Sequence, residues 1–132
     1  MAKPATPSAY TGSGAQQGRL FQVVSIADPG DTLHSINASP PKAPKGFVDT
    51  GLDIVVISGV NNDTIDRSVY IQWGGSGVQN RIPKLLYAKA GATLIIDREF
   101  ITRSDQITVW ADATAVINLF MQRRPYFVEE SA

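Results

Sequence analysis

The chain contains no cysteine, and its 132 residues include a single histidine, His34. The absence of cysteine excludes disulfide bonds, thiol nucleophiles, cysteine-ligated zinc and iron–sulfur clusters. His34 lies in a polar stretch beside a turn, and no nucleophile motif accompanies it, so its sequence context does not indicate a general base. We therefore expect a protein that is not an enzyme and that uses no metal or cofactor.

Charged residues are also scarce, at 18% of the chain, and 12 basic residues balance 12 acidic ones. A neutral chain has no electrostatic reason to bind nucleic acid or an anionic membrane. Long apolar runs are absent as well: Met1–Gly18 lacks the apolar core of a signal peptide, and Ile54–Ile57 is too short to span a bilayer. We expect no nucleic-acid or membrane partner, and a protein that is made and used without crossing a membrane.

The chain is rich in strand-forming and turn-forming residues, with 43% hydrophobic residues, 11 Gly and 8 Pro. β-propensity and alternation predict strands at Leu20–Ala27, Thr32–Ala38, Leu52–Val60, Ile65–Trp73, Ile82–Tyr87, Thr93–Ile96, Gln106–Ala111 and Ala115–Gln122. About seven or eight short strands with regular turns, and no helix, indicate an all-β fold. The expected architecture is an antiparallel two-sheet β-sandwich.

Turn signals also predict how some strands pair. Asn61–Asp63 and Asp112–Thr114 are each expected to join their flanking strands in a hairpin. The segment Asp97–Ser104 is expected to be a connection, with Phe100 and Ile101 pointing inward.

The predicted domain spans residues 19–122 and is flanked by two segments of different composition. Residues 1–18 are small and polar and are expected to form a flexible N-terminal arm. Residues 123–132 are expected to form a C-terminal tail with an apolar centre. Within the domain, Ser39–Gly46 contains three prolines, which predicts a stiff surface loop.

Aromatic residues offer one ligand-binding alternative. Trp73, Trp110, Tyr70 and Phe120 provide rings on which a sugar can stack, so a carbohydrate-binding β-sandwich module is the alternative from another functional class. Packing in a core or an interface is the more common role of such side chains.

The segments Leu86–Leu94 (LYAKAGATL) and Ile101–Ala111 (ITRSDQITVWA) carry a family resemblance. They resemble a pattern in small virion structural proteins of tailed bacteriophages, in which a glycine-containing polar segment precedes a TLxL strand. An L-x-x-x-D-Q-I-x-V segment, a turn and a final strand follow. The likeness covers roughly residues 20–122, and it implies a jelly-roll sandwich.

The resemblance implies a head decoration (cement) protein that binds the outer surface of the major capsid protein lattice and stabilises the head. Such a protein is assembled in the host cytoplasm and resides on the outer capsid surface of the virion. A small phage neck, tail or fibre protein is the alternative. The implied partners are the major capsid protein and further copies of the chain, in a dimer or trimer.

The arm and the tail are the segments expected to contact these partners, because segments that cannot fold alone often bind others. The candidate interface residues are Pro4, Pro7, Tyr10, Arg123, Arg124, Tyr126, Phe127 and Val128. Deleting either segment is expected to weaken capsid binding while the domain stays folded.

Overall fold

The computed structural model describes residues 20–34, 42–74 and 80–130, and within these ranges the chain forms strands and no α-helix. The eight strands are β1 (Phe21–Val23), β2 (Asp31–His34), β3 (Phe47–Asn61), β4 (Arg67–Trp73), β5 (Arg81–Leu86), β6 (Thr93–Thr102), β7 (Ile107–Ala111) and β8 (Ile117–Glu129). The expectation of an all-β fold is confirmed.

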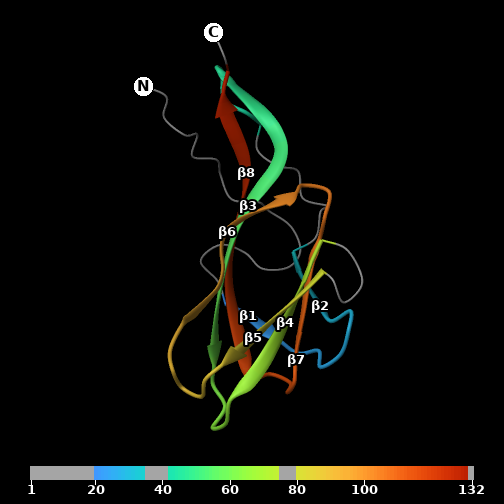
Figure 1. Ribbon diagram of the computed structural model, residues 1–132, viewed down its shortest axis with the longest axis vertical. Coiled ribbons are helices and arrows are strands. Elements are labelled where there is room, and N and C mark those ends of the chain that lie inside the picture. The colour runs from blue at the N-terminus through green and yellow to red at the C-terminus, as the bar shows by residue number, and fades with distance from the viewer. Residues whose placement is uncertain (1–19, 35–41, 75–79, 131–132) are drawn as a thin grey trace.

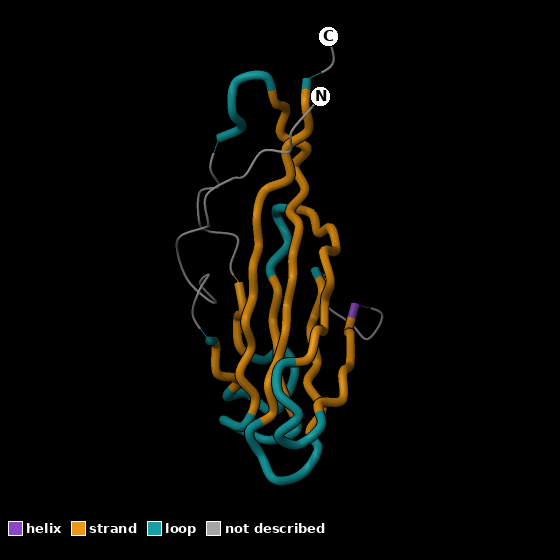
Figure 2. The backbone as a smooth tube through the Cα atoms, turned by 90° about the vertical axis from the view of Figure 1, so that its left-hand side faces the viewer, coloured by secondary structure: helices purple, strands orange, loops and turns teal. Residues whose placement is uncertain are grey.

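The strands form two four-stranded antiparallel sheets that pack against each other, with the orders β1-β8-β3-β6 and β2-β7-β4-β5 (Figures 1 and 2). The pairs β1–β8, β2–β7, β3–β6 and β4–β5 are nested in sequence. The additional pairs β3–β8 and β4–β7 join them into sheets. Nested antiparallel pairing of eight strands over two sheets is the topology of a jelly roll.

Both predicted hairpins are wrong. Strands β3 and β4 lie in different sheets, as do β7 and β8, so each of these two turns crosses from one sheet to the other. Each of these strands buries one apolar face in the shared core. A strand can bury that face from either sheet, so the apolar pattern does not determine which sheet the strand joins. The two crossings lie together at one end of the sandwich, where the Asn62 N–H donates to the carbonyl of Val116 at 2.8 Å.

The segment predicted as a connection, residues 97–104, is mostly strand. Strand β6 continues through Thr102, and its register against β3 shifts between the pairs Ile57↔Ile96 and Val55↔Glu99. Arg98 lies in this bulge with a φ of 51°, the left-handed region. Such a bulge accommodates extra residues in one strand while the pairing with the neighbouring strand continues on both sides. Ile101 points inward as expected, whereas Phe100 is half exposed.

The core lies between the sheets. All eight strands contribute buried side chains to it, and those of β3, β4, β7 and β8 include Val55, Ile57, Val69, Ile71, Ile107, Val109, Ile117, Leu119 and Met121. Burying each such side chain contributes roughly 1.5–3 kcal/mol. Gly59 also faces the core, and a Cβ there would lie 3.0 Å from side-chain atoms of Ile95 and Leu119, so this position admits no larger residue without a shift.

The edges of both sheets are short or interrupted. Strands β1 and β2 have three and four residues, β5 contains Pro83, and β6 contains the bulge at Arg98. The edge position expected from Pro83 is confirmed. Such features prevent a sheet from adding strands of other molecules at its edges.

Candidate functional site

A two-stranded ribbon extends from one end of the sandwich. Strand β6 pairs with β3 only as far as Leu52, whereas β3 and β8 continue together through the pair Phe47↔Glu129 (Figure 1). The end of the ribbon is closed by a hydrogen bond from the Glu130 N–H to the Gly46 carbonyl at 2.8 Å. Residues 123–129 therefore belong to a strand, and the expected tail boundary at residue 122 does not correspond to any break in the structure.

The base of the ribbon is a local widening of β3. Between the pairs Asp49↔Phe127 and Asp53↔Pro125, three residues of β3 lie opposite the single residue Tyr126. The widening is held by the Thr50 hydroxyl, which donates to the Tyr126 carbonyl at 2.8 Å. It also requires a positive φ of 75° at Gly51, a conformation that glycine adopts without steric cost.

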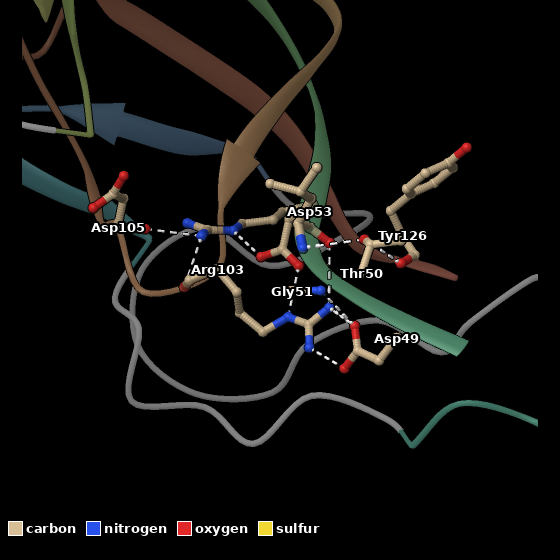
Figure 3. Close-up of polar contacts among 9 residues, drawn as sticks. Asp49, Thr50, Gly51, Asp53, Arg103, Asp105 and Tyr126 are labelled. Carbon is tan, nitrogen blue, oxygen red and sulfur yellow. Dashed lines mark hydrogen bonds and ion pairs between the residues drawn. The ribbon is translucent and has the colours of Figure 1, made fainter. Parts of the chain in front are cut away.

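Two aspartates and two arginines form a network of ion pairs at this widening. Asp49 and Asp53 flank the widening, and Figure 3 shows both of them around Arg103. Asp53 is fully buried; its carboxylate accepts from Arg103 Nε at 3.0 Å and from Arg123 Nε at 2.7 Å. Arg103 also pairs with Asp49, through Nη1 and through Nη2, the latter at 2.7 Å. Arg123 Nη2 donates to the Asp105 carbonyl at 2.8 Å. The network thus connects β3 and β8 to the connection between β6 and β7.

The network balances its charges. Two carboxylates face two guanidinium groups, so neither burial of Asp53 nor burial of Arg123 leaves an isolated charge in a low-dielectric environment. The hydrogen bonds from Arg103, followed by a bond from the Gly51 N–H, lower the pKa of Asp49 below its ordinary value. Because such contacts are specific in direction as well as in charge, they set the position of the ribbon relative to the sandwich.

The candidate interface residues have different environments. Arg123 is 2% exposed and Phe127 is 5% exposed, so neither side chain is available to a partner at the protein surface, which corrects that part of the expectation. Arg124, Tyr126 and Val128 are partly exposed on the opposite face of β8.

The remaining three candidates, Pro4, Pro7 and Tyr10, and the arm that contains them lie outside the described residues. The Ser39–Gly46 loop is described only from Lys42 onward, and that part is not strand.

The four aromatic residues do not form one platform. Tyr70 and Trp110 stack on one another, with ring centroids 5.6 Å apart, and the Arg81 guanidinium lies 4.8 Å from the Trp110 ring centroid. Trp110 is consequently only 6% exposed. Trp73 packs against the core instead, and Phe120 belongs to the other sheet. Trp110 therefore offers no open ring face for a sugar.

Sequence reasoning missed Asp49, Asp53 and Arg103 as a connected group. One signal for it is the position of Asp53 within the apolar run Leu52–Val60, because a carboxylate in a buried strand needs a cation. Which arginine supplies that cation depends on the pairing of strands that are 50 and 70 residues apart in the sequence.

Within residues 20–34, 42–74 and 80–130, no cluster of His, Cys, Asp or Glu side chains is arranged to hold a metal ion. The same residues contain no helix long and apolar enough to cross a membrane.

The chain was compared with family models, with curated proteins and with solved structures. None of them matches. The ribbon and its ion network are therefore interpreted from their own geometry.

Proposed function

We propose that this protein is a bacteriophage capsid decoration (cement) protein that binds the outer surface of the major capsid protein lattice and stabilises the head. The observation that carries this proposal is the β3–β8 ribbon, which leaves the sandwich as a projecting element and presents partly exposed apolar side chains. The jelly-roll topology is the fold implied by the resemblance of residues 86–111, and it supports the same proposal.

The ribbon is suited to attachment because its direction is fixed before a partner binds. The ion network holds its base, so little conformational entropy is lost when its tip is immobilised. Val48 and Val128 lie directly opposite each other near the tip and form a small apolar contact surface. A small surface is sufficient on a lattice, because many copies act together on one particle.

A carbohydrate-binding module has less support, because the Tyr70 ring and the Arg81 guanidinium cover Trp110. A neck, tail or fibre protein uses the same ribbon on a different part of the virion. The number of copies per virion distinguishes these two roles, since a protein bound to the capsid lattice is present in far more copies than a protein of the neck or tail.

The first test is quantitative mass spectrometry of purified virions of the phage that encodes this chain, with the major capsid protein as the internal reference. A decoration protein is expected on the order of hundreds of copies per particle. About three to twelve copies would instead identify a neck, tail or fibre protein, because those structures are small rings or bundles. Absence from the particle overturns both assignments.

A matched pair of variants tests the ribbon itself. Val48 on the ribbon and Leu85 on β5 are both 46% exposed, so Val48→Lys and Leu85→Lys make comparable changes at two different places. We expect Val48→Lys to reduce binding to undecorated capsids at least about tenfold, since it places a charge in an apolar contact. Leu85→Lys is expected to bind like the unmodified protein. Equal binding by both variants would exclude the ribbon as the attachment element.

A further inference from the structure

Strand β1 pairs with only a small part of strand β8. Strand β8 has 13 residues, and β1 lies beside the first three of them, Ile117–Leu119, at the end of β8 that is remote from the ribbon (Figure 1). From Phe120 to Glu129, no strand of the described residues lies beside β8 on the side away from β3. This side of residues 120–129, which we call the β8 edge, runs from the sandwich to the tip of the ribbon.

Alternate residues of β8 direct their backbone groups at the β8 edge. The Tyr126 carbonyl accepts a hydrogen bond from the Thr50 hydroxyl of β3, so the backbone of Tyr126 is directed at β3. Residues along one strand alternate in the side to which their N–H and C=O groups point, so Met121, Pro125 and Phe127 direct theirs at the β8 edge. Pro125 has no N–H to donate, and an edge is the place where a strand tolerates proline.

The backbone groups at the β8 edge are nevertheless buried. Met121 is 2% exposed and Phe127 is 5% exposed, and these fractions include the backbone atoms. Buried N–H and C=O groups are almost always hydrogen-bonded, and in a sheet their usual partner is a neighbouring strand. Since the described residues place no strand beside these two positions, a strand that pairs with them has to come from residues outside the described ranges.

The residues that precede β1 have the right position and length for this edge. In the register of β1, Phe21 is opposite Leu119. Continued toward the N-terminus in the same register, residues 19 and 11 come opposite Met121 and Glu129. Residues 11–19 contain no proline, so every one of them has an N–H to donate. No further loop has to be closed, because this segment leads directly into β1, which already lies beside β8.

We propose that residues 11–19 continue β1 and pair antiparallel with residues 121–129 of the same chain. The ribbon then consists of three strands, and the β8 edge is covered along its length. Residues 1–10 leave the edge at the tip of the ribbon, so the candidate interface residues of the arm come to the same end as Val48 and Val128. The proposal rests on the register of β1 and the burial of β8, and it does not depend on the proposed attachment to a capsid.

Two neighbouring glutamines provide a matched pair of variants of the full chain. In the proposed register the N–H of Gln17 points to β8 and that of Gln16 points away, so only Gln17→Pro removes a hydrogen bond between the strands. The readout is the hydrogen exchange of the Phe127 amide, measured by NMR. We expect this amide to be protected in the unmodified chain and in Gln16→Pro, and to exchange at least about fivefold faster in Gln17→Pro.

The Gln122 amide is the internal control, because it faces β3 and should keep its exchange rate in both variants. In a chain that lacks residues 1–18, the Phe127 amide is expected to lose its protection. Rapid exchange of Phe127 in the unmodified chain overturns the proposal, as do equal rates in the two proline variants or protection that survives removal of residues 1–18. Protection that is lost on dilution also overturns it, because the covering strand then comes from another molecule. A chain that passes these tests but is absent from virions leaves this proposal standing and removes the proposed function.

Discussion

At the scale of single residues, Asp53 is the side chain whose role is best defined by its surroundings. It is fully buried, and both of its carboxylate oxygens accept hydrogen bonds from arginines. Its contribution to stability depends on these partners being retained, because a buried ion pair gains little over apolar packing but is costly to break on one side.

Replacement of Asp53 by asparagine removes the negative charge and leaves Arg103 and Arg123 facing each other. We expect Asp53→Asn to lower the free energy of unfolding by about 3–5 kcal/mol, measured by urea denaturation. The matched control is Asp97→Asn, since the Asp97 side chain is exposed and its ion pair with the exposed Arg98 has an N–O distance of 3.6 Å. A loss for Asp53→Asn no larger than that of the control would show that the network contributes nothing to stability.

The sequence indicates some of these residue environments and not others. Val69 and Ile71 alternate with the polar residues of the predicted strand Ile65–Trp73, which places them on one face, and both are buried. In the sequence Arg123 resembles a surface residue at the start of a tail, because its neighbour Arg124 is also charged and Pro125 follows. Its burial results from the carboxylate of Asp53, 70 residues away, and no local pattern encodes that distance.

At the scale of elements, the β3–β8 ribbon depends on a left-handed residue at its base. Gly51 has a φ of 75°, and a Cβ built there meets no atom within 4 Å. An alanine at this position therefore makes no steric clash with other residues, but its positive φ costs about 1 kcal/mol of stability.

We expect Gly51→Ala to destabilise the ribbon locally and to leave the sandwich intact. Amide hydrogen exchange within residues 47–51 and 126–129 should become about fivefold faster, while the amides of β4 and β7 keep their rates. Gly91→Ala is the matched control, because Gly91 has a φ of 82°, equally open surroundings and a position between β5 and β6. A uniform change across all strands in Gly51→Ala would show that the ribbon does not unfold separately.

Elements were easier to predict than their pairing. Sequence patterns located β4 and β7 to within two residues at either end, because β-branched and aromatic residues fill both strands and turn-forming residues flank them. The partners of β3 and β4 were predicted incorrectly, since a short turn is compatible with a hairpin and also with a crossing between sheets. The ribbon was missed because charged residues at 123 and 124 interrupt the apolar alternation of β8.

At the scale of the whole molecule, the C-terminal residues are part of the structural framework. Strand β8 pairs with β3 over most of its length, and Arg123 of β8 forms an ion pair with the buried Asp53. The expectation that residues 123–132 can be deleted without affecting the domain therefore conflicts with the place of residues 123–129 in the sheet.

A chain that ends after Gln122 lacks Arg123 and all of the ribbon pairing. We expect its melting temperature, followed by circular dichroism, to fall by more than about 10 °C. A chain that ends after Glu130 retains β8 and should melt like the full chain. Equal melting of the two truncated chains would mean that residues 123–130 add nothing to the stability of the sandwich.

The nested strand pairing also has a consequence for the synthesis of this protein. Strands β4 and β5 are close in sequence, so their pairing closes the shortest loop at the lowest entropic cost, and each outer pair encloses a longer loop, ending with β1 and β8. Both β1 and the central strand β3 pair with β8, which comes last in sequence among the eight described strands. The sandwich therefore closes only after β8 has left the ribosome.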